Sequence, residues 1–172
     1  MKEITVFVTY NPRNEFEQTL AIRLHTIGAV HGFHMLMPDR FNGNGKMNSE
    51  TVYRINSCDY FILFSTGRST PIVLEEIKVA FAHLKDKSKI LIIYDRVKNL
   101  KHDANCTEVF IDSLKETPQQ ILDKVIRQLK LNRKPLTRKA LSKEDNSASV
   151  LGGIILIGLG LLALGSLVES EN

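Results

Sequence analysis

An uninterrupted apolar run at residues 60–64 is the feature that most limits the folds open to this chain. A strand without polar alternation is buried on both faces, and such strands belong to parallel sheets that helices cover on both sides. A small polar loop, residues 65–70, follows the run, and a helix containing Glu75 and Glu76 comes next. Because ligands bind where the carboxyl ends of parallel strands meet such loops, an acidic residue there is a candidate functional group.

Helical geometry separates the two glutamates. At about 100° per residue, one apolar stripe of this helix is expected to face the sheet: Val73, Ile77, Ala80, Phe81 and Leu84. Glu75 falls nearly opposite the stripe and is expected in solvent, whereas Glu76 falls on its margin, at the edge between core and cleft. The helix dipole alone also favours carboxylates near a helix start, so this geometry leaves a purely structural role open for both.

Strand and helix patterns alternate along the rest of the chain. Strands are predicted at residues 4–10, 33–37, 60–64 and 89–94, with a short edge strand at 109–111. Helices are predicted at residues 15–27, ending at Gly28, then from Ser49, after residue 70, and at 118–131. Strands separated by helices of this size indicate βαβ units, and therefore an α/β fold with a parallel sheet.

The C-terminal segment has a different character. Residues 150–168 contain no charged side chain, and at 1.5 Å per residue they would span roughly 28 Å, about the hydrocarbon thickness of a bilayer. Basic residues precede this run, while Glu169 and Glu171 follow it, which predicts that the N-terminal part is cytoplasmic. No long apolar leader opens the chain, so a tail-anchored protein is expected.

The predicted organisation therefore has four parts. Residues 1–132 form the α/β domain, 133–148 a basic juxtamembrane linker, 149–169 a single transmembrane helix, and 170–172 a short non-cytoplasmic tail. The net charge of +4 comes largely from the basic segment next to the expected membrane, where it can pair with anionic lipid head groups. Nothing in the sequence forms a base-stacking or recognition-helix motif, so nucleic acid is not an expected partner.

Metal binding and disulfide bonding are also not expected. Cys58 and Cys106 are too few for a disulfide framework and have no ligand spacing. His31 and His34 lie three residues apart without carboxylate or cysteine companions. The sequence therefore predicts neither a metal site nor a prosthetic group.

Three segments together resemble a known family. Residues 6–10 form a strand that ends in threonine and tyrosine, residues 38–45 contain Pro-Asp-Arg followed by two glycines, and residues 59–80 contain the buried strand, the loop serines and Glu76. Over residues 1–131 their order resembles a TIR (Toll/interleukin-1 receptor) domain. The resemblance implies a flavodoxin-like fold with a central five-stranded parallel sheet, and it places the chain in bacterial antiphage defence or signalling, at the bacterial inner membrane.

The resemblance also implies an activity and a site. In TIR domains that are enzymes, the glutamate of the third helix carries NAD glycohydrolase activity, and Glu76 matches it by position. NAD would then be a substrate, cleaved at the nicotinamide–ribose bond to ADP-ribose or a cyclic product, and self-association through the TIR domain and the transmembrane helix is expected. The resemblance implies these substrate-binding residues: Thr9, Tyr10, Asn11, Arg13, Asp39, Arg40, Phe41, Ser65, Ser69 and Ile72.

The chain departs from the enzymatic members at two points. It contains no tryptophan, and Ile72 stands where many of them have an aromatic residue. Stacking on the substrate would then come from Tyr10, Phe41 or a neighbouring subunit. Two alternatives therefore stay open: a non-enzymatic adaptor that acts through residues 38–48 and the third helix, and a nucleoside deoxyribosyltransferase-like enzyme.

Overall fold

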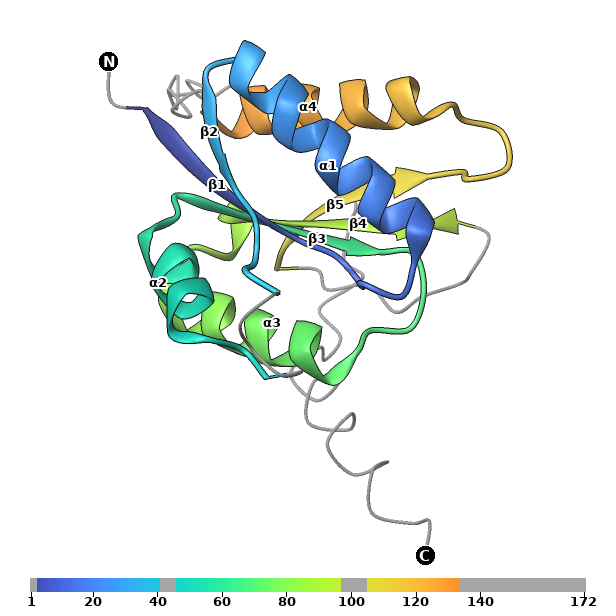
Figure 1. Cartoon of the computed structure of the whole chain (residues 1–172). Coiled ribbons are helices and arrows are strands. Elements are labelled where there is room, and N and C mark those ends of the chain that lie inside the picture. Colours follow the sequence, from blue (N-terminus) through green and yellow to red (C-terminus); the bar gives the residue numbers. More distant parts are fainter. Residues whose placement is uncertain (1–2, 41–45, 97–104, 134–172) are drawn as a thin grey trace, which may run out of the picture. The chain divides into compact units, whose positions relative to one another are not determined.

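The described part of the protein is an α/β domain built on one parallel sheet. The computed structural model describes residues 3–40, 46–96 and 105–133, all within the unit Met1–Lys134. Its strands are β1 (Ile4–Thr9), β2 (Phe33–Leu36), β3 (Tyr60–Ser65), β4 (Ile90–Asp95) and β5 (Thr107–Ile111). All pair in parallel in the order β2-β1-β3-β4-β5, which is the flavodoxin-like order (Figure 1). The predicted five-stranded parallel sheet is confirmed.

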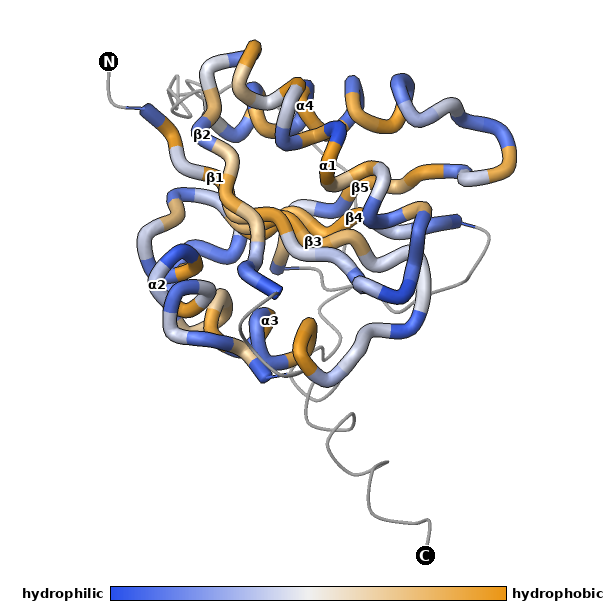
Figure 2. The backbone as a smooth tube through the Cα atoms, viewed as in Figure 1, coloured by the Kyte–Doolittle hydropathy of each residue, from blue (hydrophilic) through white to orange (hydrophobic). Residues whose placement is uncertain are grey.

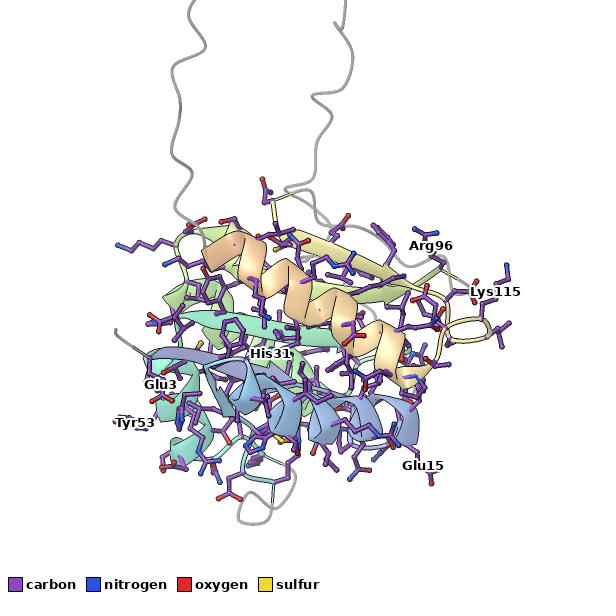
Figure 3. The ribbon with its side chains drawn as sticks, turned by 90° about the horizontal axis from the view of Figure 1, so that it is seen from above. Glu3, Glu15, His31, Tyr53, Arg96 and Lys115 are labelled. Atoms are coloured by element: carbon purple, nitrogen blue, oxygen red, sulfur yellow. The ribbon has the colours of Figure 1, made fainter. Side chains whose placement is uncertain are left out.

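Helices cover both faces of this sheet. Helices α1 (Glu15–Val30) and α4 (Pro118–Arg133) lie side by side on one face, and α2 (Ser49–Ser57) and α3 (Pro71–His83) lie on the other (Figures 1 and 3). Successive strand residues point to opposite faces. Ile62, for example, packs with α1 and α4, while Phe61 and Leu63 pack with α2 and α3.

Burial on both faces explains the apolar strands. Figure 2 shows that hydrophobic residues concentrate in the sheet, and every residue of β4 is buried. A strand between two helical layers has no solvent-facing side, so polar residues have no place along it until it ends. The apolar run at residues 60–64 is therefore part of β3, an inner strand of the sheet.

The predicted end of the first helix was wrong. Helix α1 begins at Glu15 as predicted, with Asn14 as its N-cap, but it continues past Gly28 to Val30. Gly28 is buried inside the helix, where a Cβ atom would come within 2.5 Å of the Cγ and Sδ atoms of Met35 in β2. The chain turns instead at Gly32, whose φ of 78° lies in the left-handed region that glycine adopts readily. Close helix–strand packing, not helix termination, is the reason for Gly28.

Other boundaries differ by one or two residues. Strands β1 and β2 each end one residue earlier than predicted, β4 runs from 90 to 95, β5 begins at 107, and α4 continues to 133. A short 3-10 helix, η1 (Lys87–Lys89), precedes β4. In the part of the chain that the structure describes, no helix has the length and apolar character needed to cross a bilayer. The predicted span at 149–169 lies outside the described residues.

The Gly28 contact predicts a loss of stability on substitution. Gly28→Val should lower the free energy of unfolding by about 1–3 kcal/mol, because the new side chain overlaps the buried Met35. Chemical denaturation of the two proteins measures this difference. Adding Met35→Ala should recover part of the loss, since it opens space at the same contact. Equal stability of Gly28→Val and the wild type would show that Gly28 is not needed for packing.

Candidate active site

The topology places a switch point between the carboxyl ends of β1 and β3. After β1 the chain crosses to β2 through α1 on one face, and after β3 it crosses to β4 through α3 on the other face. The two neighbouring strands therefore send their loops in opposite directions. Ligands of open α/β sheets bind outside the strand ends at such a point.

Helix α3 carries Glu76 to this point. The predicted stripe faces the sheet, since Val73, Ile77, Ala80 and Leu84 are buried and Phe81 is partly buried. Glu75 is exposed, as predicted. Glu76 has no exposed surface at all, so its side chain lies inside the domain and not at an open cleft edge. A fully buried carboxylate requires partners for both of its oxygens.

Thr9 and Arg40 are those partners. The Thr9 hydroxyl, at the end of β1, donates a hydrogen bond to Glu76 Oε2. Arg40 Nη2 donates to the same oxygen at 3.2 Å, and Arg40 Nη1 lies 3.1 Å from Glu76 Oε1 in an ion pair without hydrogen-bond geometry. The side chain of Arg40 is 15% exposed, so the cation is the outer member of the pair.

Tyr10 supports the cation from the side of β1. Its carbonyl oxygen accepts a hydrogen bond of 3.1 Å from Arg40 Nη2, and its ring centroid lies 5.4 Å from the Arg40 guanidinium carbon. This distance is within the range of a cation–π contact. The structure thus brings together four of the predicted residues: Thr9, Tyr10, Arg40 and Glu76.

Opposing effects act on the charge of Glu76. Burial raises its pKa above the ordinary value of 4.5, because an ionised carboxylate loses its hydration inside the protein. The positive charge of Arg40 and the hydrogen bond from Thr9 act in the opposite direction and offset part of this increase. The site therefore holds a carboxylate whose ionised form depends on its immediate partners.

A second buried carboxylate, Glu17 of α1, holds the two loops at the strand ends together. Its Oε2 accepts from the backbone N–H of Asn11 at 2.7 Å. Its Oε1 accepts from the backbone N–H and the hydroxyl of Thr66 at 2.8 and 2.9 Å. Glu17 thus joins the loop after β1 to the loop after β3, on the face opposite Glu76.

Sequence reasoning missed Glu17, although a signal was present. Glu17 lies on the same helical stripe as the buried residues Leu20, Ala21 and Leu24 of α1. A carboxylate at that spacing has to be hydrogen-bonded inside the domain. Asp95, at the end of β4, is a further buried acid that was missed, and it accepts a hydrogen bond of 2.6 Å from the Ser113 hydroxyl.

Two of the other predicted substrate-binding residues make hydrogen bonds to partners other than Glu76. Asn11 donates from its side chain to the Arg68 carbonyl at 2.7 Å, and Arg13 is exposed. The backbone N–H of Asp39 donates to the Thr51 hydroxyl at 3.0 Å, which anchors the chain just before Arg40. Three others are half-buried in the β3–α3 segment: Ser65, Ser69 and Ile72. Phe41 lies outside the described residues.

Two further features of the described residues bear on other possible sites. No three His, Cys, Asp or Glu side chains within them could together hold a metal ion. A surface hollow of about 310 Å³ lies against α4 and the end of α1, near His31, which Figure 3 labels. Its lining includes Asp123, Arg127 and Lys130, all on the outer face of the domain and away from Glu76.

Comparison with known proteins gives likenesses of fold only. No family model and no curated protein matches the chain. Among solved structures, a CMP N-glycosidase of Clostridium botulinum is 17% identical with a TM-score of 0.47, over 70% of this chain and 97% of that chain. A response regulator receiver protein of Sinorhizobium medicae is 13% identical with a TM-score of 0.44, over 75% and 96%.

A third solved structure shares only a portion of its length with this chain. The lysine decarboxylase of Francisella novicida is 16% identical with a TM-score of 0.46, over 76% of this chain but 18% of that chain. At these values the three likenesses concern the α/β architecture alone. The functional argument therefore rests on the residues at the carboxyl ends of β1 and β3.

The contacts of Glu17 predict a large structural effect of its removal. Glu17→Ala should lower the free energy of unfolding by about 3 kcal/mol or more, because it leaves the two buried donors of Thr66 and the partly buried N–H of Asn11 without their acceptor. Glu15→Ala is the matched control, since Glu15 lies in the same helical turn and is exposed. Urea denaturation compares the two variants. Similar, small losses for both would show that the Glu17 cross-link contributes little.

Proposed function

We propose that the protein is an NAD glycohydrolase and that Glu76 is its catalytic carboxylate. The observation that carries this proposal is the burial of Glu76 at the topological switch point between β1 and β3, beside Thr9 and Arg40. A carboxylate that served only as a favourable helix-terminal charge would remain in solvent, as Glu75 does. The resemblance of residues 1–131 to TIR domains supports the same residue.

The reaction needs little more than one carboxylate. The nicotinamide of NAD is a pyridinium cation, so when the bond between its nitrogen and the ribose breaks, the electron pair neutralises the ring and no general acid is required. Positive charge develops on the ribose as an oxocarbenium-like species, and an ionised Glu76 stabilises it. Addition of water with loss of a proton then gives ADP-ribose. Addition of an adenine nitrogen of the same molecule gives a cyclic product.

Burial makes this stabilisation stronger. In a site from which water is excluded, the attraction between a carboxylate and a developing cation is larger than in bulk water. Tyr10 supplies an aromatic face next to the carboxylate, at the place where Arg40 now packs. It can take the stacking role that Ile72, in place of the usual aromatic residue, does not fill.

The wider role follows from the sequence resemblance and from the C-terminal residues. The proposed enzyme is anchored by the predicted helix at 149–169, with residues 1–132 in the cytoplasm of a bacterium. It associates with itself and with membrane lipid, and it acts in antiphage defence or signalling. Clustering in the membrane would bring neighbouring domains together.

One observation favours a second candidate function, a non-enzymatic adaptor. Arg40 already pairs with Glu76, and buried ion pairs of this kind also occur as purely structural elements. In an adaptor the pair would only fix the chain after β2 for contacts with other TIR domains. Substitution of Glu76 would then change stability without affecting any turnover.

The enzyme proposal predicts a selective loss of activity. Glu76→Gln should lower the rate of NAD cleavage by about 100-fold or more, because the charge that stabilises the ribose cation is removed. Glu75→Gln should retain the wild-type rate, since Glu75 is exposed on the same helix. NAD consumption by the full chain in nanodiscs, with products separated by chromatography, measures both. Wild-type activity in Glu76→Gln would refute the assignment of the site.

The pH dependence of cleavage should report the same carboxylate. The ionised form of Glu76 is the active one and its pKa is raised by burial. The rate should therefore fall as the pH is lowered, with an apparent pKa above 4.5. Initial rates measured at subsaturating NAD across the acid range give this value. A rate that stays constant down to pH 4.5 would exclude a raised Glu76 pKa as the controlling group.

A further inference from the structure

Arg40 occupies the position that a ligand of Glu76 would need. Its two terminal nitrogens lie at 3.1 and 3.2 Å from the two carboxylate oxygens, and the Thr9 hydroxyl takes a further place on Oε2. An oxygen engaged in this way is not free to accept hydrogen bonds from the hydroxyls of a ribose. In the described structure, Oε2 therefore already accepts two hydrogen bonds from the protein's own donors, while Oε1 faces Arg40 Nη1 in an ion pair without a hydrogen bond.

The shape of this occupant indicates what could replace it. The guanidinium is a flat, delocalised cation, and it lies near both the Tyr10 ring and the Glu76 carboxylate. A pyridinium nucleoside is also a flat cation, and it has donors, its ribose hydroxyls, attached next to the ring. The surroundings of the Arg40 guanidinium thus match the charge and the planarity of such a ligand.

The contacts of Arg40 are compatible with its exchange. Arg40 lies in the irregular chain between β2 and α2, its side chain is partly exposed, and its Nε atom has no hydrogen-bond partner among the described residues. Glu76, in contrast, lies within a helix and is fully buried. An unpaired buried carboxylate is strongly unfavourable, so when Arg40 leaves, its charge has to be replaced by another cation or by a proton on Glu76.

We propose that Arg40 is an internal competitor for the ligand position at Glu76, which a planar cationic nucleoside displaces on binding. This inference rests on the proposed function, because it concerns the same carboxylate. It gives Arg40 a role in specificity: a nucleoside with a neutral base cannot replace the charge of Arg40, so it is excluded from the site. The protein then selects pyridinium nucleosides before any bond is broken.

Binding of small cations tests the proposal without any turnover. The full chain in nanodiscs is titrated with 1-methylnicotinamide, with methylguanidinium and with neutral nicotinamide, and binding is followed by ligand-observed NMR. Arg40→Ala should bind both cations at least about tenfold more tightly than the wild type, because removal of a competitor raises the apparent affinity. The affinity for neutral nicotinamide should rise much less. In the double variant Arg40→Ala/Glu76→Gln the gain should disappear.

Several results would overturn the proposal. They are equal cation affinities of wild type and Arg40→Ala, an equal gain for neutral nicotinamide, and a gain that persists after Glu76→Gln is added. Arg40→Lys serves as a second variant that keeps a charge for Glu76 and is expected to have intermediate affinity. Failure of both Arg40 variants to fold, with methylguanidinium unable to restore the fold, would show that the pair is structural.

The proposal and the enzyme function can fail separately. Tighter cation binding by Arg40→Ala without NAD cleavage by the wild type would support Arg40 as a competitor and refute the proposed glycohydrolase activity. NAD cleavage by the wild type without any gain in cation affinity in Arg40→Ala would support the glycohydrolase activity and refute Arg40 as a competitor. Where both hold, Arg40→Ala should lower the KM for NAD more than it changes kcat, since Arg40 acts on access to the carboxylate.

Discussion

The contact of Glu76 with Thr9 and Arg40 organises the carboxyl edge of the sheet. Burying a carboxylate removes its hydration, and the protein replaces the lost water with a hydroxyl from β1 and a guanidinium from the chain after β2. These groups come from three separate parts of the sequence. Their meeting links α3 to the end of β1 and to the chain after β2, so the candidate site and the local fold depend on the same interaction.

The two buried glutamates at this edge are stabilised in different ways. Glu17 is held by two backbone N–H groups and one hydroxyl, none of which carries a net charge or belongs to a flexible long side chain. Glu76 depends in part on the charge of Arg40, whose side chain is partly exposed. The first arrangement suits a permanent cross-link between loops. The second suits a position where one cation can be exchanged for another.

Much of the fold was predictable because burial on both faces leaves a clear mark in the sequence. The inner strands are continuous apolar runs, and the stripe on α3 correctly predicted that Glu75 is exposed, although it placed Glu76 at the margin of the core and the structure buries it fully. The errors lie where local pattern and tertiary packing compete. Glycine is typical of a helix end, so the helix was expected to stop at Gly28. The helix continues past it, and glycine is needed there because Met35 of β2 approaches too closely for a side chain.

The sequence by itself determined the alternation of strands and helices, the parallel sheet and the helix that carries the candidate carboxylate, because these depend on periodicity within short segments. Only the tertiary structure decided that Arg40 pairs with Glu76, that Tyr10 lies beside the pair, and that Glu17 joins the loops after β1 and β3. Such contacts join residues 36 to 67 positions apart in the case of Glu76. They arise where strand ends converge, and no local pattern records which side chains meet there.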